Sequence, residues 1–222
     1  GRSETAEPGL LGHSEGGLIA PMVAADEAVA FIVMLAGPAT PGSAVLAEQT
    51  ALIVEAEGAP ADIVAWQTAL AEQVIAAAAG DLDDTALDAE LLRIAAEAGT
   101  TMPELLAAQM TVDDIYADLA AYRDPWMRYF LAYDPAPALA ALDIPVLALF
   151  GGVDLQVPAG TNAPAMTGLL THPGSEVEVV PGVNHLFQSS ETGKVSEYAD
   201  LTETMSPGVL DRVTAWILSI AG

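Results

Sequence analysis

Three short runs of mostly apolar residues constrain the fold of this chain more than any other feature of its sequence. They span residues 29–35, 145–150 and 177–180, and each is followed within two residues by glycine or proline. Such runs, rich in β-branched side chains, are typical of parallel strands whose two faces are both covered by helices. Leu10 and Leu11 lead into a glycine-rich turn in a similar way. We therefore predict an α/β protein with a mostly parallel sheet and helices on both faces.

The segment between the first two of these runs has a different pattern. Ile63, Trp66 and Leu70 recur at steps of three and four residues, which is the period of an amphipathic helix. A connection of about 100 residues between strands far exceeds an ordinary crossover. We therefore predict a helical cap of residues 40–142, inserted into a core that consists of residues 1–39 and 143–222.

A last amphipathic helix is expected near the C-terminus. Ser206 and Pro207 are typical of a helix start. Apolar residues three or four positions apart then predict its buried face, namely Leu210, Val213, Ile217 and Ile220.

The composition excludes several classes of function. The chain has 31 acidic and 6 basic residues, a formal net charge of −25 at pH 7. A field of this sign repels nucleic acids and anionic lipids, so neither is expected as a partner. No apolar run is long enough to span a membrane, and the absence of cysteine excludes disulfides and cysteine nucleophiles. The acidity indicates either adaptation to high salt, where ions screen the self-repulsion, or simply high solubility.

The stretch Gly12-His13-Ser14-Glu15-Gly16 joins the first apolar residues to a segment of small and apolar side chains suited to a buried helix. A serine between two glycines at a strand–helix junction is typical of a nucleophile elbow. We expect glycine on both sides because a Cβ at either position would clash with the turn. The Glu15 amide would point into the same space as the hydroxyl, at the positive end of the helix. It is our candidate for one oxyanion-hole donor.

Asp154 and His185 are the candidate partners of Ser14. Each follows the end of a predicted strand, and the carboxyl ends of parallel strands meet at one edge of a sheet. The order Ser, Asp, His along the chain is the one that accompanies this kind of elbow. Of the other histidines, His13 lies inside the elbow and His172 has no strand ahead of it. We predict Ser14 as nucleophile, His185 as base and Asp154 as the acid that orients the imidazole.

These motifs resemble those of the α/β-hydrolase superfamily, specifically bacterial esterases related to dienelactone hydrolases and serine aminopeptidase-like hydrolases. The resemblance is carried by residues 12–17, 129–135, 145–154 and 184–188. It implies that the chain hydrolyses small esters with short-to-medium acyl chains through an acyl-enzyme, without a cofactor or metal. Peptidase or thioesterase chemistry with the same triad is an alternative.

The sequence departs from the family pattern ahead of the elbow. Only eleven residues precede Gly12, whereas the family places several strands there and takes its second oxyanion donor from one of their loops. We therefore expect the chain to be the C-terminal portion of the usual domain. Either a missing N-terminal segment or a second copy in a homodimer would then cover the exposed edge of the first strand. The rival interpretation is a catalytically incomplete fragment that acts as a binding or interaction module.

An aromatic group precedes the strand that leads to Asp154. Trp126, Tyr129 and Phe130 could form the wall of an acyl pocket under the cap, and we name them as substrate-binding candidates. The alternative is that they pack the cap onto the core.

Overall fold

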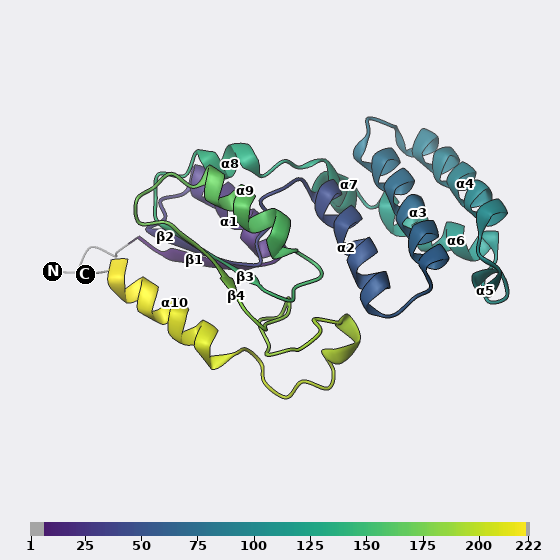
Figure 1. The fold of residues 1–222 in the computed structure, drawn as a ribbon. Coiled ribbons are helices and arrows are strands. Elements are labelled where there is room, and N and C mark those ends of the chain that lie inside the picture. The colour runs from purple at the N-terminus through teal and green to yellow at the C-terminus, as the bar shows by residue number, and fades with distance from the viewer. Residues whose placement is uncertain (1–6, 221–222) are drawn as a thin grey trace. The chain divides into compact units, whose positions relative to one another are not determined.

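The structure is a computed structural model that describes residues 7–220, and the chain divides into two compact units (Figure 1). The sheet unit contains the chain up to Thr40 and from Asp134 onward. The helical unit contains Pro41–Tyr133. None of the helices within residues 7–220 is long and apolar enough to cross a lipid bilayer.

The sheet unit is built on four parallel strands that pair in the order in which they occur along the chain. They are β1 (Gly9–His13), β2 (Phe31–Leu35), β3 (Val146–Gly151) and β4 (Glu176–Val180). The central strands β2 and β3 are almost completely buried, which explains why their sequences are continuously apolar. The predicted α/β fold with a mostly parallel, partial sheet is confirmed.

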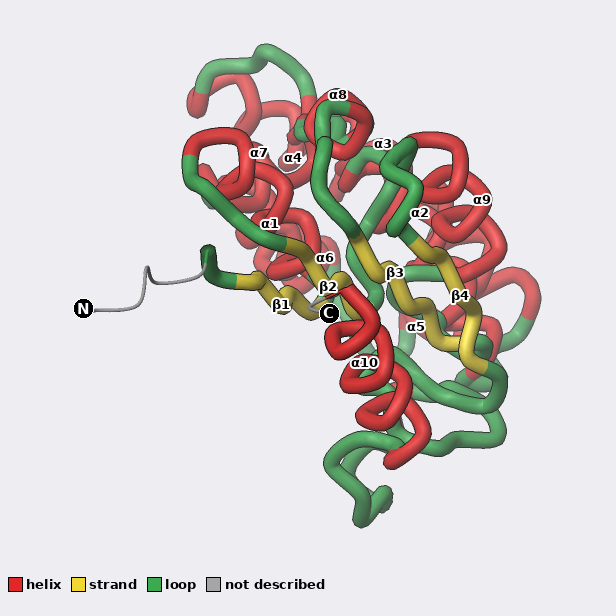
Figure 2. Tube along the Cα trace, turned by 90° about the vertical axis from the view of Figure 1, so that its left-hand side faces the viewer, coloured by secondary structure: helices red, strands yellow, loops and turns green. Residues whose placement is uncertain are grey.

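Helices cover both faces of this sheet. On one face lie α1 (Glu15–Asp26), α8 (Ala136–Ala140) and α9 (Ala159–Leu169), and on the other lies α10 (Pro207–Ile220) (Figures 1 and 2). Right-handed crossovers that always step in the same direction along a sheet place their helices on the same face. The strand order therefore explains why α1, α8 and α9 share one face. Helix α10 follows the last strand and covers the opposite face.

The buried face of α10 agrees with the predicted one only in part. Val209, Val213 and Trp216 are buried, Trp216 to 2% exposure, whereas Leu210 is 53% exposed. The indole of Trp216 packs edge-on against the ring of Phe31, with the centroids 5.8 Å apart. An aromatic side chain buries more apolar area than an aliphatic one, so this contact sets the rotation of the helix. Of the predicted set, Val213 is buried, Ile217 and Ile220 are half-buried, and Leu210 is wrong.

The helical unit contains six α-helices and one 3-10 helix within the described residues. They are α2 (Gly42–Ala56), α3 (Ala61–Ala79), α4 (Asp84–Thr101), α5 (Glu104–Ala107), α6 (Val112–Asp118), η1 (Leu119–Arg123) and α7 (Pro125–Ala132). Val74, Leu91 and Ile115 form part of one core cluster, which joins α3, α4 and α6. A second cluster joins α3 to α7 through Ile75 and Leu131. The unit therefore has an apolar core of its own.

Candidate active site

Ser14 occupies a strained turn between β1 and α1. Its φ of 53° and ψ of −118° lie outside the conformations that side-chain-bearing residues prefer. A left-handed backbone costs such a residue about 1–2 kcal/mol, so neighbouring contacts must hold it. The Ser14 amide donates to the Leu35 carbonyl at 2.8 Å, and its carbonyl accepts from the Gly17 amide at 2.9 Å. These bonds fix the serine at the carboxyl end of β1, where its side chain is half-buried.

The glycines around the serine differ from the sequence-based expectation at one position. A Cβ on Gly12 would lie 2.1 Å from the carbonyl oxygen of Gly16, so glycine is required at position 12. A Cβ on Gly16 would meet no atom within 4 Å, and the predicted clash there is wrong. The other tight position is Gly17, whose Cβ would lie 2.6 Å from the Cα of Gly37. The close approach is therefore between the first turn of α1 and the loop that follows β2.

Asp154 and His185 are hydrogen-bonded to each other. Nδ1 of His185 lies 2.9 Å from Oδ2 of Asp154, and both residues are 5% exposed. The other carboxylate oxygen, Oδ1, accepts from the backbone amides of Gln156 at 2.8 Å and Val157 at 3.0 Å. Because a carboxylate accepts a proton at Nδ1, the neutral imidazole carries its hydrogen there. Its basic nitrogen is then Nε2.

His13, the residue before Ser14, links the strand–helix turn to the loop that carries His185. Nε2 of His13 lies 2.8 Å from the carbonyl oxygen of His185, and the two ring centroids are 4.8 Å apart. Within residues 7–220, no hydrogen bond joins the hydroxyl of Ser14 to Nε2 of His185. Hydrogen bonds of this kind are often long in an empty site and tighten when substrate binds. The fold thus brings the segments of the three residues to one edge of the sheet and pairs two of their side chains.

Two buried polar residues that we did not predict organise the loop around His185. Oδ1 of Asn184 accepts from the amides of Leu186 and Gln188, each at 3.0 Å. Nδ2 of Asn184 in turn donates to Oε1 of Gln188 at 3.1 Å. This pairing supports the left-handed backbone of Phe187, which has a φ of 59°. The sequence signal that could have identified these two residues is the spacing Asn184-x-x-x-Gln188 around the predicted base.

The loop that follows Asp154 is supported by a tyrosine that sequence reasoning also missed. Nε2 of Gln156 donates to the hydroxyl of Tyr198 at 2.9 Å, next to the short 3-10 helix η2 (Val195–Glu197). Burial raises the pKa of Tyr198, so its hydroxyl remains protonated at neutral pH. This contact holds the segment whose amides bind the Asp154 carboxylate.

Glu15 is the first residue of α1, at the positive end of the helix dipole. The role of the Glu15 amide remains a prediction.

The aromatic candidates belong to α7 of the helical unit. The rings of Trp126 and Phe130 stack with centroids 5.7 Å apart, and those of Tyr129 and Tyr133 at 5.6 Å. Trp126 and Tyr129 are exposed, whereas Phe130 is half-buried against the core of the unit. The substrate-binding role of these residues remains a prediction.

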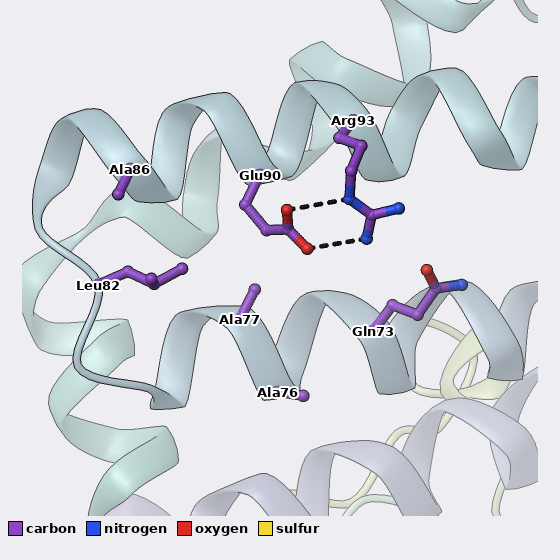
Figure 3. Close-up of a pocket in the computed structure, with 7 residues that line it drawn as sticks. All are labelled: Gln73, Ala76, Ala77, Leu82, Ala86, Glu90 and Arg93. Carbon is purple, nitrogen blue, oxygen red and sulfur yellow. Dashed lines mark hydrogen bonds and ion pairs between the residues drawn. The ribbon is translucent and has the colours of Figure 1, made fainter.

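A cavity of about 450 Å³ lies between α3 and α4 of the helical unit (Figure 3). Its lining consists of Gln73, Ala76, Ala77, Leu82, Ala86, Glu90 and Arg93. The guanidinium of Arg93 is already paired with Glu90 at 2.8 Å and with Glu97 at 2.5 Å. None of the predicted site residues lines this cavity. Among residues 7–220, no group of three or more His, Asp or Glu side chains is arranged to hold a metal ion.

Comparison with known proteins gives one family match and several structural ones. A family model described as alpha/beta hydrolase fold matches residues 6–192. The esterase RhEst1 from Rhodococcus sp. ECU1013 is 21% identical, with 96% of this chain and 65% of that chain covered and a TM-score of 0.43. A thermophilic esterase from Thermogutta terrifontis is 18% identical, with 96% and 65% covered and a TM-score of 0.43. Est816, described as an N-acyl homoserine lactone degrading enzyme, is 22% identical, with 87% and 65% covered and a TM-score of 0.41.

The chain therefore spans 65% of the length of each of these three structures. No curated protein matches it.

Proposed function

Because the chain belongs to the α/β-hydrolase fold family, we propose that it is a serine hydrolase that cleaves small carboxylic esters. The observation that carries the proposal is the buried hydrogen bond of 2.9 Å between His185 and Asp154. It lies at the sheet edge where Ser14 occupies a left-handed strand–helix turn. A nucleophile, a base and an orienting acid at one edge are the parts that acyl transfer requires.

In the proposed reaction, Oγ of Ser14 attacks the acyl carbon of the ester while Nε2 of His185 takes the hydroxyl proton. The buried carboxylate of Asp154 stabilises the imidazolium that forms. The tetrahedral intermediate collapses, the C–O bond to the alcohol breaks, and the alcohol leaves with the proton from His185. Water then attacks the acyl-enzyme with the same base, which releases the carboxylic acid and restores Ser14.

The negative oxygen of the tetrahedral intermediate needs hydrogen-bond donors. We assign one donor to the Glu15 amide at the start of α1. Within the described residues β1 pairs only with β2, so its outer edge is open to a further strand. We propose that the second donor comes with the segment that pairs there, either preceding chain or a second copy. The loss of one such donor lowers kcat by about 10²–10³-fold.

The substrate range that we propose is esters with short-to-medium acyl chains, with Trp126, Tyr129 and Phe130 as the apolar lining. A thioesterase or peptidase would use the same three residues and differ in the pocket. The rival from another class is a non-catalytic module that binds a partner through the helical unit. The paired Asp154 and His185 favour the enzyme, because a binding module has no need of a buried carboxylate–imidazole pair.

Active-site labelling tests the proposal directly. The protein is treated with a fluorophosphonate probe, and the modified residue is located by mass spectrometry. We expect an adduct on Ser14 that disappears in His185→Ala and persists in the control His172→Ala, whose imidazole lies in a separate turn and bonds the Gly174 amide. If the native protein is folded by circular dichroism and stays unlabelled, the hydrolase proposal fails.

A substrate panel then separates the chemistries. Nitrophenyl acetate, butyrate and octanoate report on acyl length, and an acyl thioester and a peptide anilide report on the alternatives. We expect turnover of the short esters and not of the anilide. Light scattering on the active sample shows whether a second copy accompanies activity.

A further inference from the structure

The side chain of His13 contacts the loop that carries the proposed base. It is the last residue of β1, and its half-buried side chain faces the loop that carries His185. Its Nε2 lies 2.8 Å from the His185 carbonyl oxygen, and its ring lies 4.8 Å from the His185 ring. On another side its ring meets that of Phe187 edge-on, with the centroids 6.4 Å apart. The side chain next to the nucleophile thus contacts the residue proposed as base.

The contact fixes the protonation of His13. A backbone carbonyl can only accept, so Nε2 of His13 carries the hydrogen and donates it. Burial lowers the pKa of His13, and the nearby His185 lowers it further, although the hydrogen bond to the carbonyl and the Asp154 charge act against this. His13 is therefore neutral at pH 7. A neutral ring places no second positive charge beside the imidazolium that forms on His185 during the reaction.

We propose that His13 is a positioning residue for the hydrolysis: its Nε2–H holds the backbone of His185 against the end of β1 and thereby sets the distance between base and nucleophile. This inference rests on the proposed function. The hydrogen bond from Asp154 fixes the rotation of the imidazole ring. The hydrogen bond from His13 fixes the position of the His185 backbone, to which that ring is attached. Small displacements of reacting groups cost large factors in rate, so a clamp on the backbone of the base acts on kcat.

A pair of substitutions separates positioning from packing. His13→Phe keeps a flat ring against Phe187 and removes the donor, whereas His13→Gln keeps an N–H donor at a similar reach. We expect His13→Phe to lower kcat by about tenfold, with KM changed by less than about twofold. We expect His13→Gln to stay within about threefold of the native kcat. The control His172→Phe, away from the elbow, should leave both parameters unchanged.

Hydrogen exchange provides a readout that does not depend on turnover. The amides of residues 183–189 should exchange faster in His13→Phe and at the native rate in His13→Gln, because the bond holds this loop. If His13→Phe leaves both kcat and exchange unchanged, or if His13→Gln is as impaired as His13→Phe, the proposal is overturned.

The two proposals can fail separately. A native protein that neither turns over esters nor is labelled at Ser14 refutes the hydrolase. The exchange rates then still decide whether His13 holds the loop: unchanged exchange in His13→Phe refutes the clamp as well, and faster exchange supports it.

Discussion

The substitution Asp154→Asn tests the orientation of the base, because the structure dictates which way the new amide must point. Oδ1 of Asp154 accepts from two backbone amides, and only a carbonyl oxygen can replace it there. The amide NH₂ of the asparagine is therefore forced to face Nδ1 of His185. Nδ1 must then accept, so the hydrogen of the imidazole moves to Nε2. A base that is already protonated at Nε2 cannot take the proton of Ser14.

We expect this variant to lose about 10⁴-fold in kcat, the magnitude seen when the wrong tautomer is imposed in a serine protease. That factor corresponds to about 5.5 kcal/mol of transition-state stabilisation. The assay is steady-state hydrolysis of nitrophenyl butyrate, with a fluorophosphonate labelling rate as a second measurement. Because the side chain keeps its shape, the unfolding temperature should change little.

Asp211→Asn is the matched control, since Asp211 is exposed on α10. It removes the same charge without touching the site and should keep the native kcat. A variant Asp154→Asn that retains more than about a tenth of the native activity would refute the assignment of Asp154 as the orienting acid.

Three further predictions concern the stability of the fold and of one of its loops. Gly12→Ala should destabilise the protein by more than about 2 kcal/mol, because its Cβ would lie 2.1 Å from a backbone oxygen. Gly16→Ala should instead stabilise it by roughly 0.5 kcal/mol, since that position lies in α1 with open space around it; urea unfolding measures both. Hydrogen bonds from Thr192 and Ser190 lower the pKa of Glu197 from its ordinary 4.5, so its stabilising contribution is complete above that pH and is lost as the pH falls below it. Exchange in its loop, corrected for intrinsic rates, should therefore accelerate below pH 4.5, and Glu197→Gln should abolish this pH dependence.

The strands and the elbow were predictable because their sequences have one physical explanation. A strand buried on both faces must be apolar throughout, and β2 and β3 are. The turn at Ser14 needs a residue without Cβ at Gly12, and the sequence provides it. These constraints act over a few neighbouring residues, so they can be identified from sequence alone.

The errors arose where distant contacts decide between local alternatives. The C-terminal helix has apolar residues on more than one side, and the ring of Phe31, about 185 positions away, selects Trp216 for burial. Gly16 and Gly17 are equivalent in sequence, and the packing of Gly37 decides that the second is the restricted one. Neither choice is encoded in the local pattern.

In the candidate site, too, some features follow from the local sequence and others depend on contacts in the folded chain. Strand ends and chain order were sufficient to select Ser14, Asp154 and His185 for one edge. The hydrogen bonds that place the imidazole depend on loop conformation, so the contributions of Asn184 and Gln188 were not foreseen. Buried polar side chains such as these are satisfied by partners that only the folded backbone brings near.

The left-handed backbone at Ser14 also determines what mutation can do at this position. Glycine adopts such a conformation without steric strain, so Ser14→Gly would release about 1 kcal/mol of strain, which roughly offsets the extra conformational entropy that glycine loses on folding. Folding stability alone therefore gives the chain no reason to keep a serine here. Only a benefit from the hydroxyl itself would preserve it over generations of mutation.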